Sequence, residues 1–246
     1  MKKTILIIIL VLITAGCIFY GTKKHFGNHV KFFDHGLINI ELGDDGFEDE
    51  KKSDDNREES RSIDQTLEKF SNIKIDSAIM EIRLETGDNF SIQGSWNKSW
   101  LRPEVSVNNG TLNVLQKSRK RNNTGNNNCR ITITIPEGSK LSDITIDSNV
   151  GEIKFRKIAA EDIHIDLNVG EISLRDVNFE NVIIDNNVGE VSVDTDANLD
   201  DYEISLSSDV GQVNVNGRSY KRSYNQRGSG KNRIKIDTNV GEINLK

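Results

Sequence analysis

A twelve-residue phrase occurs six times in this chain, and its clearest copies read Ile-x-Ile-Asp-x-Asn-Val-Gly-Glu-Ile-x-Leu. A unit of this size cannot bury its own apolar face, so repeated units must stack on one another to form a core. The repetition therefore predicts a stacked architecture, and it does not by itself predict an activity. The copies begin at Ile73, Ile144, Ile163, Val182, Ile204 and Ile234.

The spacing of apolar residues within a copy predicts two short strands joined at a corner. Apolar residues occupy positions 1, 3, 7, 10 and 12. The step from 7 to 10 is odd, so one continuous strand would turn its second half away from the core. Glycine at position 8 can form the corner, because it adopts backbone conformations closed to other residues. The predicted corners are Gly151, Gly170, Gly189, Gly211 and Gly241, and the valines before them, Val150, Val169, Val188, Val210 and Val240, are expected to form an inward column.

The distances between copies predict how the units are arranged. From Ile144 onward the copies start 19, 19, 22 and 30 residues apart, which indicates one coil per copy with insertions in the longer gaps. The predicted fold is all-β, a β-solenoid (parallel β-helix-like) of about 19-residue coils whose strands pair in parallel. Stacking in register would also align Asn149, Asn168, Asn187, Asp209 and Asn239 in a hydrogen-bonded column.

The same stacking would align carboxylates in two columns. We expect these side chains to be solvated, and Ca²⁺ binding is the alternative. The predicted columns are Asp147, Asp166, Asp185 and Asp237, and Glu152, Glu171, Glu190 and Glu242.

The chain between the first two copies predicts an antiparallel cap over residues 65–143, and the solenoid repeats fill residues 144–246. Asn109-Gly110 between alternating apolar residues is a strong hairpin signal. The first copy is divergent, with Met80 in place of the glycine, as expected for a capping unit. Trp96 and Trp100 are expected to be buried in this cap rather than to form a sugar-stacking platform.

The N-terminal segment, residues 1–22, predicts attachment to a membrane. Lys2 and Lys3 precede a long apolar run, which fits an uncleaved anchor. Thr14-Ala15-Gly16-Cys17 also looks like a lipobox, in which case Cys17 would be lipidated. Residues 23–64 read as a juxtamembrane segment and an acidic spacer, since residues 44–64 hold ten acidic and four basic residues, 4 − 10 = −6. Both fates place the folded part outside the bacterial cell membrane.

Composition and motifs narrow the classes of function. Two cysteines exclude a disulfide framework, and no constellation predicts a catalytic site, a metal site or a cofactor. The insertion before the last copy is basic, interleaved with tyrosine and free of acidic residues, which predicts a polyanion-binding loop. Outside a membrane its partner would be an envelope protein, anionic lipid or cell-wall polymer, and not a nucleic acid. The loop residues are Arg218, Tyr220, Lys221, Arg222, Tyr224, Arg227 and Lys231.

The repeated Ile-Asp-x-Asn-Val-Gly-Glu-Ile phrase behind an apolar N-terminus resembles the DUF4097 family of bacterial adhesin-like, β-strand-repeat proteins. The resemblance covers Ile73 to Lys246 and implies a membrane-associated β-solenoid of the cell envelope without catalytic residues. The expected function is a non-enzymatic, membrane-tethered scaffold or adhesion module. An envelope-stress sensor or regulatory accessory that binds a membrane partner through the basic loop is the alternative, and a polysaccharide-active enzyme is a third.

Overall fold

The computed structural model describes residues 61–117 and 127–246, all within the compact unit Arg57–Lys246. The predicted anchor, the lipidation site Cys17 and most of the acidic spacer lie outside the described residues. No helix in the described part of the chain is both long enough and apolar enough to cross a membrane.

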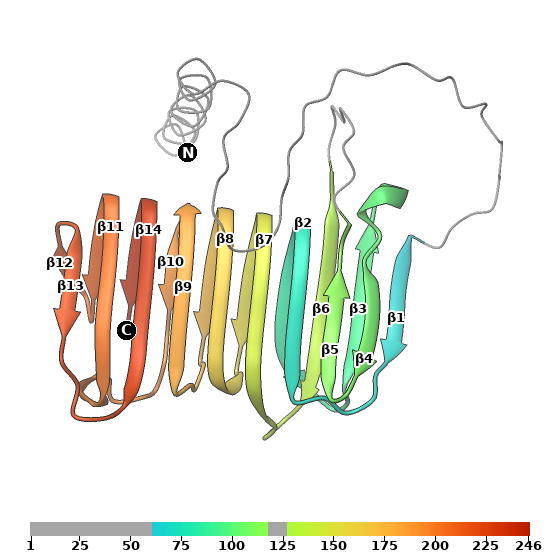
Figure 1. Ribbon diagram of the computed structural model, residues 1–246, viewed down its shortest axis with the longest axis horizontal. Helices are drawn as coiled ribbons and strands as arrows, with labels where there is room; N and C mark the ends of the chain where they lie inside the picture. The colour runs from blue at the N-terminus through green and yellow to red at the C-terminus, as the bar shows by residue number, and fades with distance from the viewer. Residues whose placement is uncertain (1–60, 118–126) are drawn as a thin grey trace, which may run out of the picture. The chain divides into compact units, whose positions relative to one another are not determined.

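The described residues form one 14-stranded sheet that winds into a stack, with two short 3-10 helices (Figure 1). The strands are β1 (Ser62–Thr66), β2 (Asn72–Gly87), β3 (Ser91–Trp96), β4 (Glu104–Asn108), β5 (Thr111–Leu115), β6 (Cys129–Pro136), β7 (Lys140–Arg156), β8 (Ala159–Arg175), β9 (Asn181–Val188), β10 (Val191–Val193), β11 (Tyr202–Val215), β12 (Arg218–Tyr220), β13 (Ser223–Gln226) and β14 (Asn232–Leu245); the helices are η1 (Ser99–Leu101) and η2 (Leu199–Asp201).

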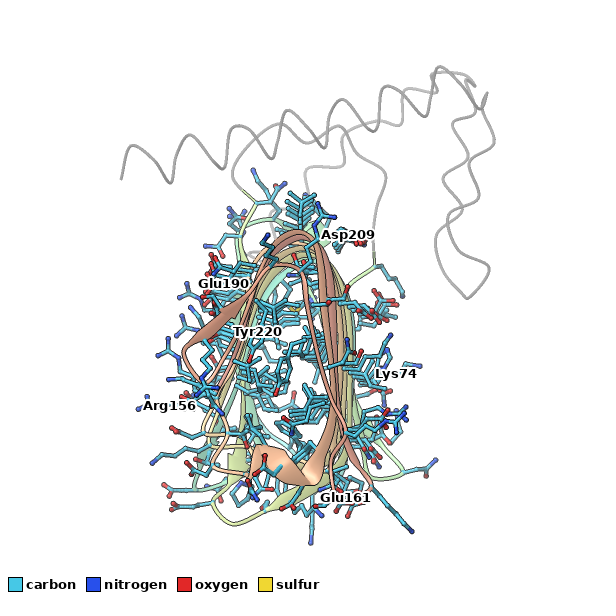
Figure 2. The ribbon with its side chains drawn as sticks, turned by 90° about the vertical axis from the view of Figure 1, so that its left-hand side faces the viewer. Lys74, Arg156, Glu161, Glu190, Asp209 and Tyr220 are labelled. Carbon is cyan, nitrogen blue, oxygen red and sulfur yellow. The ribbon has the colours of Figure 1, made fainter. Side chains whose placement is uncertain are left out.

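Equivalent positions of the copies pair in parallel and in register. Ile73 pairs with Ile144, and Ile144 pairs with Ile163. Figure 2 looks along the stack: Lys74 lies on one face, Arg156 and Glu190 lie on the other, and Asp209 lies at the apex where the faces meet. We call these the first face, which carries positions 2 and 4 of each copy, the second face, which carries positions 9 and 11, and the apex. The predicted β-solenoid class is confirmed.

The copies do not stack in chain order. The sixth copy, β14, lies between the fourth copy, β9 and β10, and the fifth copy, β11. The outer edge of β11 is occupied by β12 and β13, which pair with it antiparallel. The insertion thus closes this end of the stack. After the insertion, the chain forms β14, which lies between β9 and β11.

The first copy is a full member of the stack, although the sequence assigned it to an antiparallel cap. Strand β2 pairs in parallel with β7 from Asn72 to Glu85. Antiparallel pairing is confined to strands outside the copies: β1 with β3, β3 with β6, and β4 with β5. The Asn109-Gly110 hairpin is confirmed, with φ of 51° and 73° at the two turn residues between β4 and β5.

The prediction that the valines at position 7 form an inward column is wrong. Val150 and Val169 are 44% exposed and Val210 is 64% exposed. Alternation continues through position 5, which points inward, and the chain turns after it, so parity resets before the valine. The buried position-5 column consists of Ser77, Ser148, Leu167, Asn186, Thr238 and Ser208.

Several polar members of this column hydrogen-bond to neighbouring coils, whereas the buried atoms Asn186 Oδ1 and Thr238 Oγ1 have no hydrogen-bond partner in the described part of the chain. Ser77 Oγ donates to Ser148 Oγ at 2.9 Å, and Ser208 Oγ donates to the Gly241 carbonyl oxygen at 2.9 Å. Asn186 Nδ2 donates to the Gly170 carbonyl oxygen at 3.3 Å. At Asn186 and Ser208, a polar side chain replaces apolar packing where the chain turns, because a carbonyl group of the adjacent coil is within reach.

The corner glycines are required by the closeness of neighbouring coils. A Cβ on Gly170 would overlap the carbonyl oxygen of Gly151, and a Cβ on Gly241 would overlap that of Gly189. Gly170 also has a φ of 150°, a backbone conformation that residues with a side chain rarely adopt. Position 8 admits Met80 because no other copy lies on the outer side of β2.

At the N-terminal end of the stack, the apex is capped by the side chain of Gln116, which the repeat pattern does not predict. Gln116 Oε1 accepts hydrogen bonds from the backbone N–H groups of Ala78 and Ile79 at 3.1 and 2.8 Å. Its Nε2 donates to the Leu101 carbonyl oxygen at 2.7 Å. Buried Gln116 therefore satisfies amides that an additional coil would otherwise have to satisfy.

The predicted asparagine column is confirmed over four coils. Asn168 Nδ2 donates to Asn149 Oδ1 at 2.8 Å, and Asn187 Nδ2 donates to Asn168 Oδ1 at 2.6 Å. Asn239 Nδ2 donates to Asn187 Oδ1 at 2.7 Å, in keeping with the position of β14 next to β9. Asp209 follows Asn239 at the C-terminal end of the stack.

Two valines in β11 test the direction of the apex side chains. We expect Val213→Ala to lower the free energy of unfolding by about 2 kcal/mol, because this fully buried side chain leaves a cavity. Val210→Ala, the matched change at the exposed position, should stay within about 0.5 kcal/mol of the parent. Urea denaturation of both variants measures the difference, and a large loss in Val210→Ala would contradict the outward placement.

Candidate interaction surfaces

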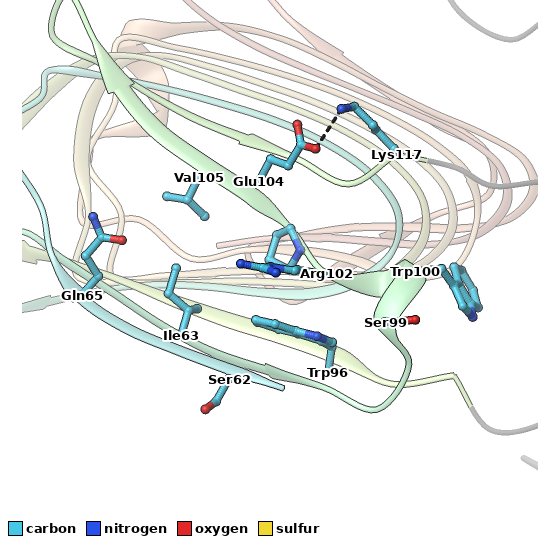
Figure 3. Close-up of a pocket in the computed structure, with 11 residues that line it drawn as sticks. Ser62, Ile63, Gln65, Trp96, Ser99, Trp100, Arg102, Glu104, Val105 and Lys117 are labelled. Atoms are coloured by element: carbon cyan, nitrogen blue, oxygen red, sulfur yellow. Dashed lines mark hydrogen bonds and ion pairs between the residues drawn. The ribbon is translucent and has the colours of Figure 1, made fainter. Parts of the chain in front are cut away.

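A cleft of about 730 Å³ lies at the N-terminal end of the stack, between β1, β4 and η1 (Figure 3). Its apolar part contains Ile63 of β1, Val105 of β4 and the indole of Trp96, which is only 6% exposed. Trp100, in η1, also lines the cleft and is half-buried. An ion pair of 2.8 Å between Lys117 Nζ and Glu104 Oε1 stands at the rim, so the cleft is mixed in character.

The cleft is bordered by two sheet edges. In the described residues, β1 pairs with β3 alone and β4 pairs with β5 alone. The second side of each strand therefore has no strand partner there. Sheet edges are general places for another strand to add.

The opposite end of the stack carries the predicted basic loop, and Figure 2 views the molecule from this end. Strand β12 continues the second face and β13 the first face, so the insertion forms an antiparallel half-coil over β11. Half-buried Tyr220 and Tyr224 meet across it with ring centroids 4.8 Å apart, and both pack against the core.

The basic side chains of the loop are exposed, and none forms an ion pair with another residue in 61–117 or 127–246. Acidic residues also occur on β11 and on η2 at this end of the stack. Asp209 lies at the apex of β11, Asp201 is in η2, and Glu203 is already paired with Arg233 at 3.4 Å. The tyrosines have a structural role in closing the core, while the basic side chains have none in the described contacts. The residues concerned are Arg218, Lys221, Arg222, Arg227 and Lys231.

Aspartates form an unbroken column of five along the first face: Asp76, Asp147, Asp166, Asp185 and Asp237. Ser207 ends this column at β11. Although Asp147 reaches solvent, partial desolvation raises the pKa of its carboxyl group, and the charges of Asp76 and Asp166 raise it further. Desolvation likewise raises the pKa of Asp185, against the opposing effect of Lys235. Like charges stacked one strand apart repel each other.

Four glutamates on the second face interact with other side chains. Burial acts to raise the pKa of Glu81, but hydrogen bonds from Arg130 and Arg83 outweigh it, and the pKa is lowered. Lys154 Nζ lies 2.5 Å from Glu152 Oε1. Asparagines of neighbouring coils hold two further members: Asn244 Nδ2 donates to Glu190 Oε1, and Asn214 Nδ2 donates to Glu242 Oε1.

The described residues contain no group of three or more His, Cys, Asp or Glu side chains arranged to hold a metal ion. Cys129 is buried in the core, and its desolvation raises the pKa of the thiol to about 11. This thiol is therefore protonated at neutral pH.

The model of the family described as Toastrack DUF4097 matches residues 70–221. A solved structure of a candidate cell adhesion protein from Clostridium sporogenes matches with a TM-score of 0.57 and 21% identity, covering 75% of this chain and 98% of that one. A candidate adhesin from Bacteroides fragilis matches with a TM-score of 0.37 and 15% identity, covering 75% of this chain and 96% of that one. No curated protein sequence matches the chain. The match to the Clostridium structure shows that this chain and that protein share a fold.

The aspartate column generates a prediction on pH and stability. We expect Asp147→Asn to raise the free energy of unfolding by about 0.5 kcal/mol at pH 7, because it removes repulsion within the column. A raised pKa means that folding disfavours the charged form, so the gain is complete above the raised pKa. The gain shrinks as the pH falls through that pKa and vanishes below the ordinary value of 3.8. Urea denaturation between pH 3 and pH 7 measures it, with exposed Asp88→Asn as the control outside the column.

Proposed function

The chain belongs to the Toastrack DUF4097 family, and from this premise we propose that it is a non-enzymatic, membrane-tethered scaffold or adhesion-like protein of the bacterial envelope. In this proposal the β-solenoid is displayed outside the cell membrane. Residues 1–22 provide the tether, and the part of the predicted spacer that precedes β1 holds the domain away from the bilayer. The sequence predicts a spacer that extends to residue 64, but Ser62, Ile63 and Asp64 belong to β1.

The observation that carries the proposal is the uninterrupted register of outward side chains along the stack. Asparagines bond to one another along the apex, and glutamates of the second face are held by Arg, Lys and Asn side chains. The Asn–Asn and Asn–Glu hydrogen bonds join neighbouring coils, and similar polar groups recur at the same place in most coils. A repeating, rigid surface suits attachment or spacing, whereas acid–base catalysis needs two groups whose environments separate their pKa values.

The structural match gives secondary support. The Clostridium sporogenes protein with the same fold is named for cell adhesion, which agrees with the role proposed for this chain. The apolar run from Ile5 to Ile13, between Lys3 and the lipobox-like Thr14-Ala15-Gly16-Cys17, supports the tether.

Cell fractionation and surface proteolysis test the location. We expect the full chain to sediment with membranes, to be released by detergent rather than by salt, and to be degraded by protease added to intact cells. Deletion of residues 1–22 should move the domain to a soluble fraction. A soluble cytosolic pool of the full chain would contradict the proposal. Cys17→Ser distinguishes the two tethers, because it abolishes membrane attachment of a lipoprotein and leaves an uncleaved anchor unchanged.

A second candidate function is a sensor or regulatory accessory that recognises an anionic polymer or membrane partner. It is favoured by the five exposed basic side chains of the C-terminal half-coil, which have no ion-pair partner among the described residues. A polyanion would bind there by charge neutralisation, and binding would weaken as salt is raised.

Replacing Arg218, Lys221, Arg222, Arg227 and Lys231 by Ser tests this second function. We expect capture of an anionic cell-wall polymer from envelope extracts to fall by at least about tenfold at low salt, because five charges are removed. The matched control replaces five exposed basic residues elsewhere, Arg61, Lys69, Lys98, Arg156 and Arg175, by Ser. Unchanged capture by the loop variant, or equal loss in both variants, would rule out a specific role for the loop.

A further inference from the structure

The sheet of the first face ends at β4, at the N-terminal end of the stack (Figure 1). Strand β4 pairs antiparallel with β5, and β5 pairs in parallel with β2. Within residues 61–117 and 127–246, the backbone of β4 forms no hydrogen bond outside its pairing with β5. At the opposite end of this face, the outer edge of β11 is occupied by β13. The edge of β4 has no such cover among the described residues.

The short hairpin determines which main-chain groups of β4 point outward. Asn108 pairs with Thr111 across a two-residue turn, so these two residues exchange hydrogen bonds with each other. In an antiparallel pair, residues of this kind alternate with residues whose N–H and C=O groups point to the other side. Counting back from Asn108, the main-chain groups of Val105 and Val107 therefore point away from β5, toward the outer side of the sheet.

The sequence of β4 is nearly symmetric about its centre. It reads Glu-Val-Ser-Val-Asn, with Ser106 between two valines. If two copies of this strand pair antiparallel about Ser106, Val105 of each lies opposite Val107 of the other, and their outward main-chain groups meet. Glu104 then lies opposite the neutral Asn108, whereas parallel pairing in register would place Glu104 beside Glu104. Strand β4 is therefore self-complementary in one antiparallel register.

The side chains of β4 are divided between the core and solvent. Val105 and Val107 are half-buried and pack against the core, and Val105 lines the cleft of about 730 Å³ (Figure 3). A second β4 would bring its own valines beside them, and cross-strand pairs of β-branched residues stabilise a sheet. Glu104, Ser106 and Asn108 are exposed, so these three side chains can be changed without disturbing the core.

We propose that two copies of this chain associate through β4 as a symmetric dimer, with the two strands antiparallel and Ser106 of one copy opposite Ser106 of the other. The twofold axis passes between these serines, and the first faces of the two copies join into one continuous sheet. The inward valines of the two copies then lie side by side. The dimer is independent of the tether, since it uses only residues of the folded part.

Single cysteines test the register in the full-length chain, solubilised in detergent. We expect Ser106→Cys to raise the disulfide-linked dimer fraction at least about tenfold over the parent, because residues directly opposite in an antiparallel pair lie within reach of a disulfide. Glu104→Cys and Asn108→Cys chains should not link to themselves, but should link to each other when the two are produced together. The parent is the control for Cys17 and Cys129, which all the chains share.

Charge at the twofold axis provides a second measurement. Ser106→Lys places two lysines opposite each other, and we expect it to raise the dissociation constant of the dimer about fivefold. Asn108→Lys places each lysine opposite Glu104 of the other copy, and we expect it to lower the dissociation constant by a similar factor. Sedimentation in detergent measures both constants, and an unchanged urea midpoint confirms that each variant is folded.

Three outcomes would overturn the proposal. The first is a parent chain that stays monomeric at every concentration measured. The second is disulfide linkage of Glu104→Cys chains to themselves as efficiently as Ser106→Cys chains, which would show contact without the stated register. The third is slow hydrogen exchange of the Val105 and Val107 amides in a monomeric parent, which would assign the edge to an occupant other than a second copy.

Discussion

The close approach of backbones at the apex is the constraint on which the rest of the fold depends. Parallel strands lie about 4.8 Å apart, and at position 8 the coils face each other so directly that a Cβ would overlap the next carbonyl oxygen. Glycine is therefore needed at each interior apex. Since all interior copies carry it at the same position, stacking them in register brings glycine over glycine, as at Gly151, Gly170 and Gly189. A shift of one residue would put valine or glutamate into this contact.

Register at the apex determines the chemistry of every other column. Identical residues meet at each step, which benefits asparagine because one amide can both donate and accept. It disadvantages aspartate, which can only accept when ionised. Desolvation raises the pKa values of Asp147 and Asp185, and the neighbouring aspartates raise them further. On the second face the cost is reduced because Arg83, Lys154 and asparagines alternate with the glutamates. The repeat thus stabilises the stack through most of its columns and tolerates one repulsive column.

The sequence predicts those features that depend on repetition and fails where the outcome depends on a single contact. The solenoid class and the column from Asn149 to Asn187 follow directly from the spacing of identical phrases. The valine direction does not, because the composition of position 5 is mixed, with Ser148 and Leu167 in adjacent coils, and conceals its inward orientation. Strand β14 lies between β9 and β11, and the basic loop pairs with the outer edge of β11. No periodic signal marks that pairing, and none marks Gln116.

The ends of the stack are where this protein can acquire specificity. An interior column repeats one group at a fixed spacing, so a change in one coil is opposed by both neighbours through the shared register. An end has one neighbour only, and there the chain substitutes individual residues: Gln116 replaces a coil at the apex, and Tyr220 and Tyr224 replace aliphatic packing. The cleft beside β1 and the basic half-coil over β11 both lie at such ends. Selection for a ligand or partner can therefore alter these residues while the glycine register, and with it the fold, stays intact.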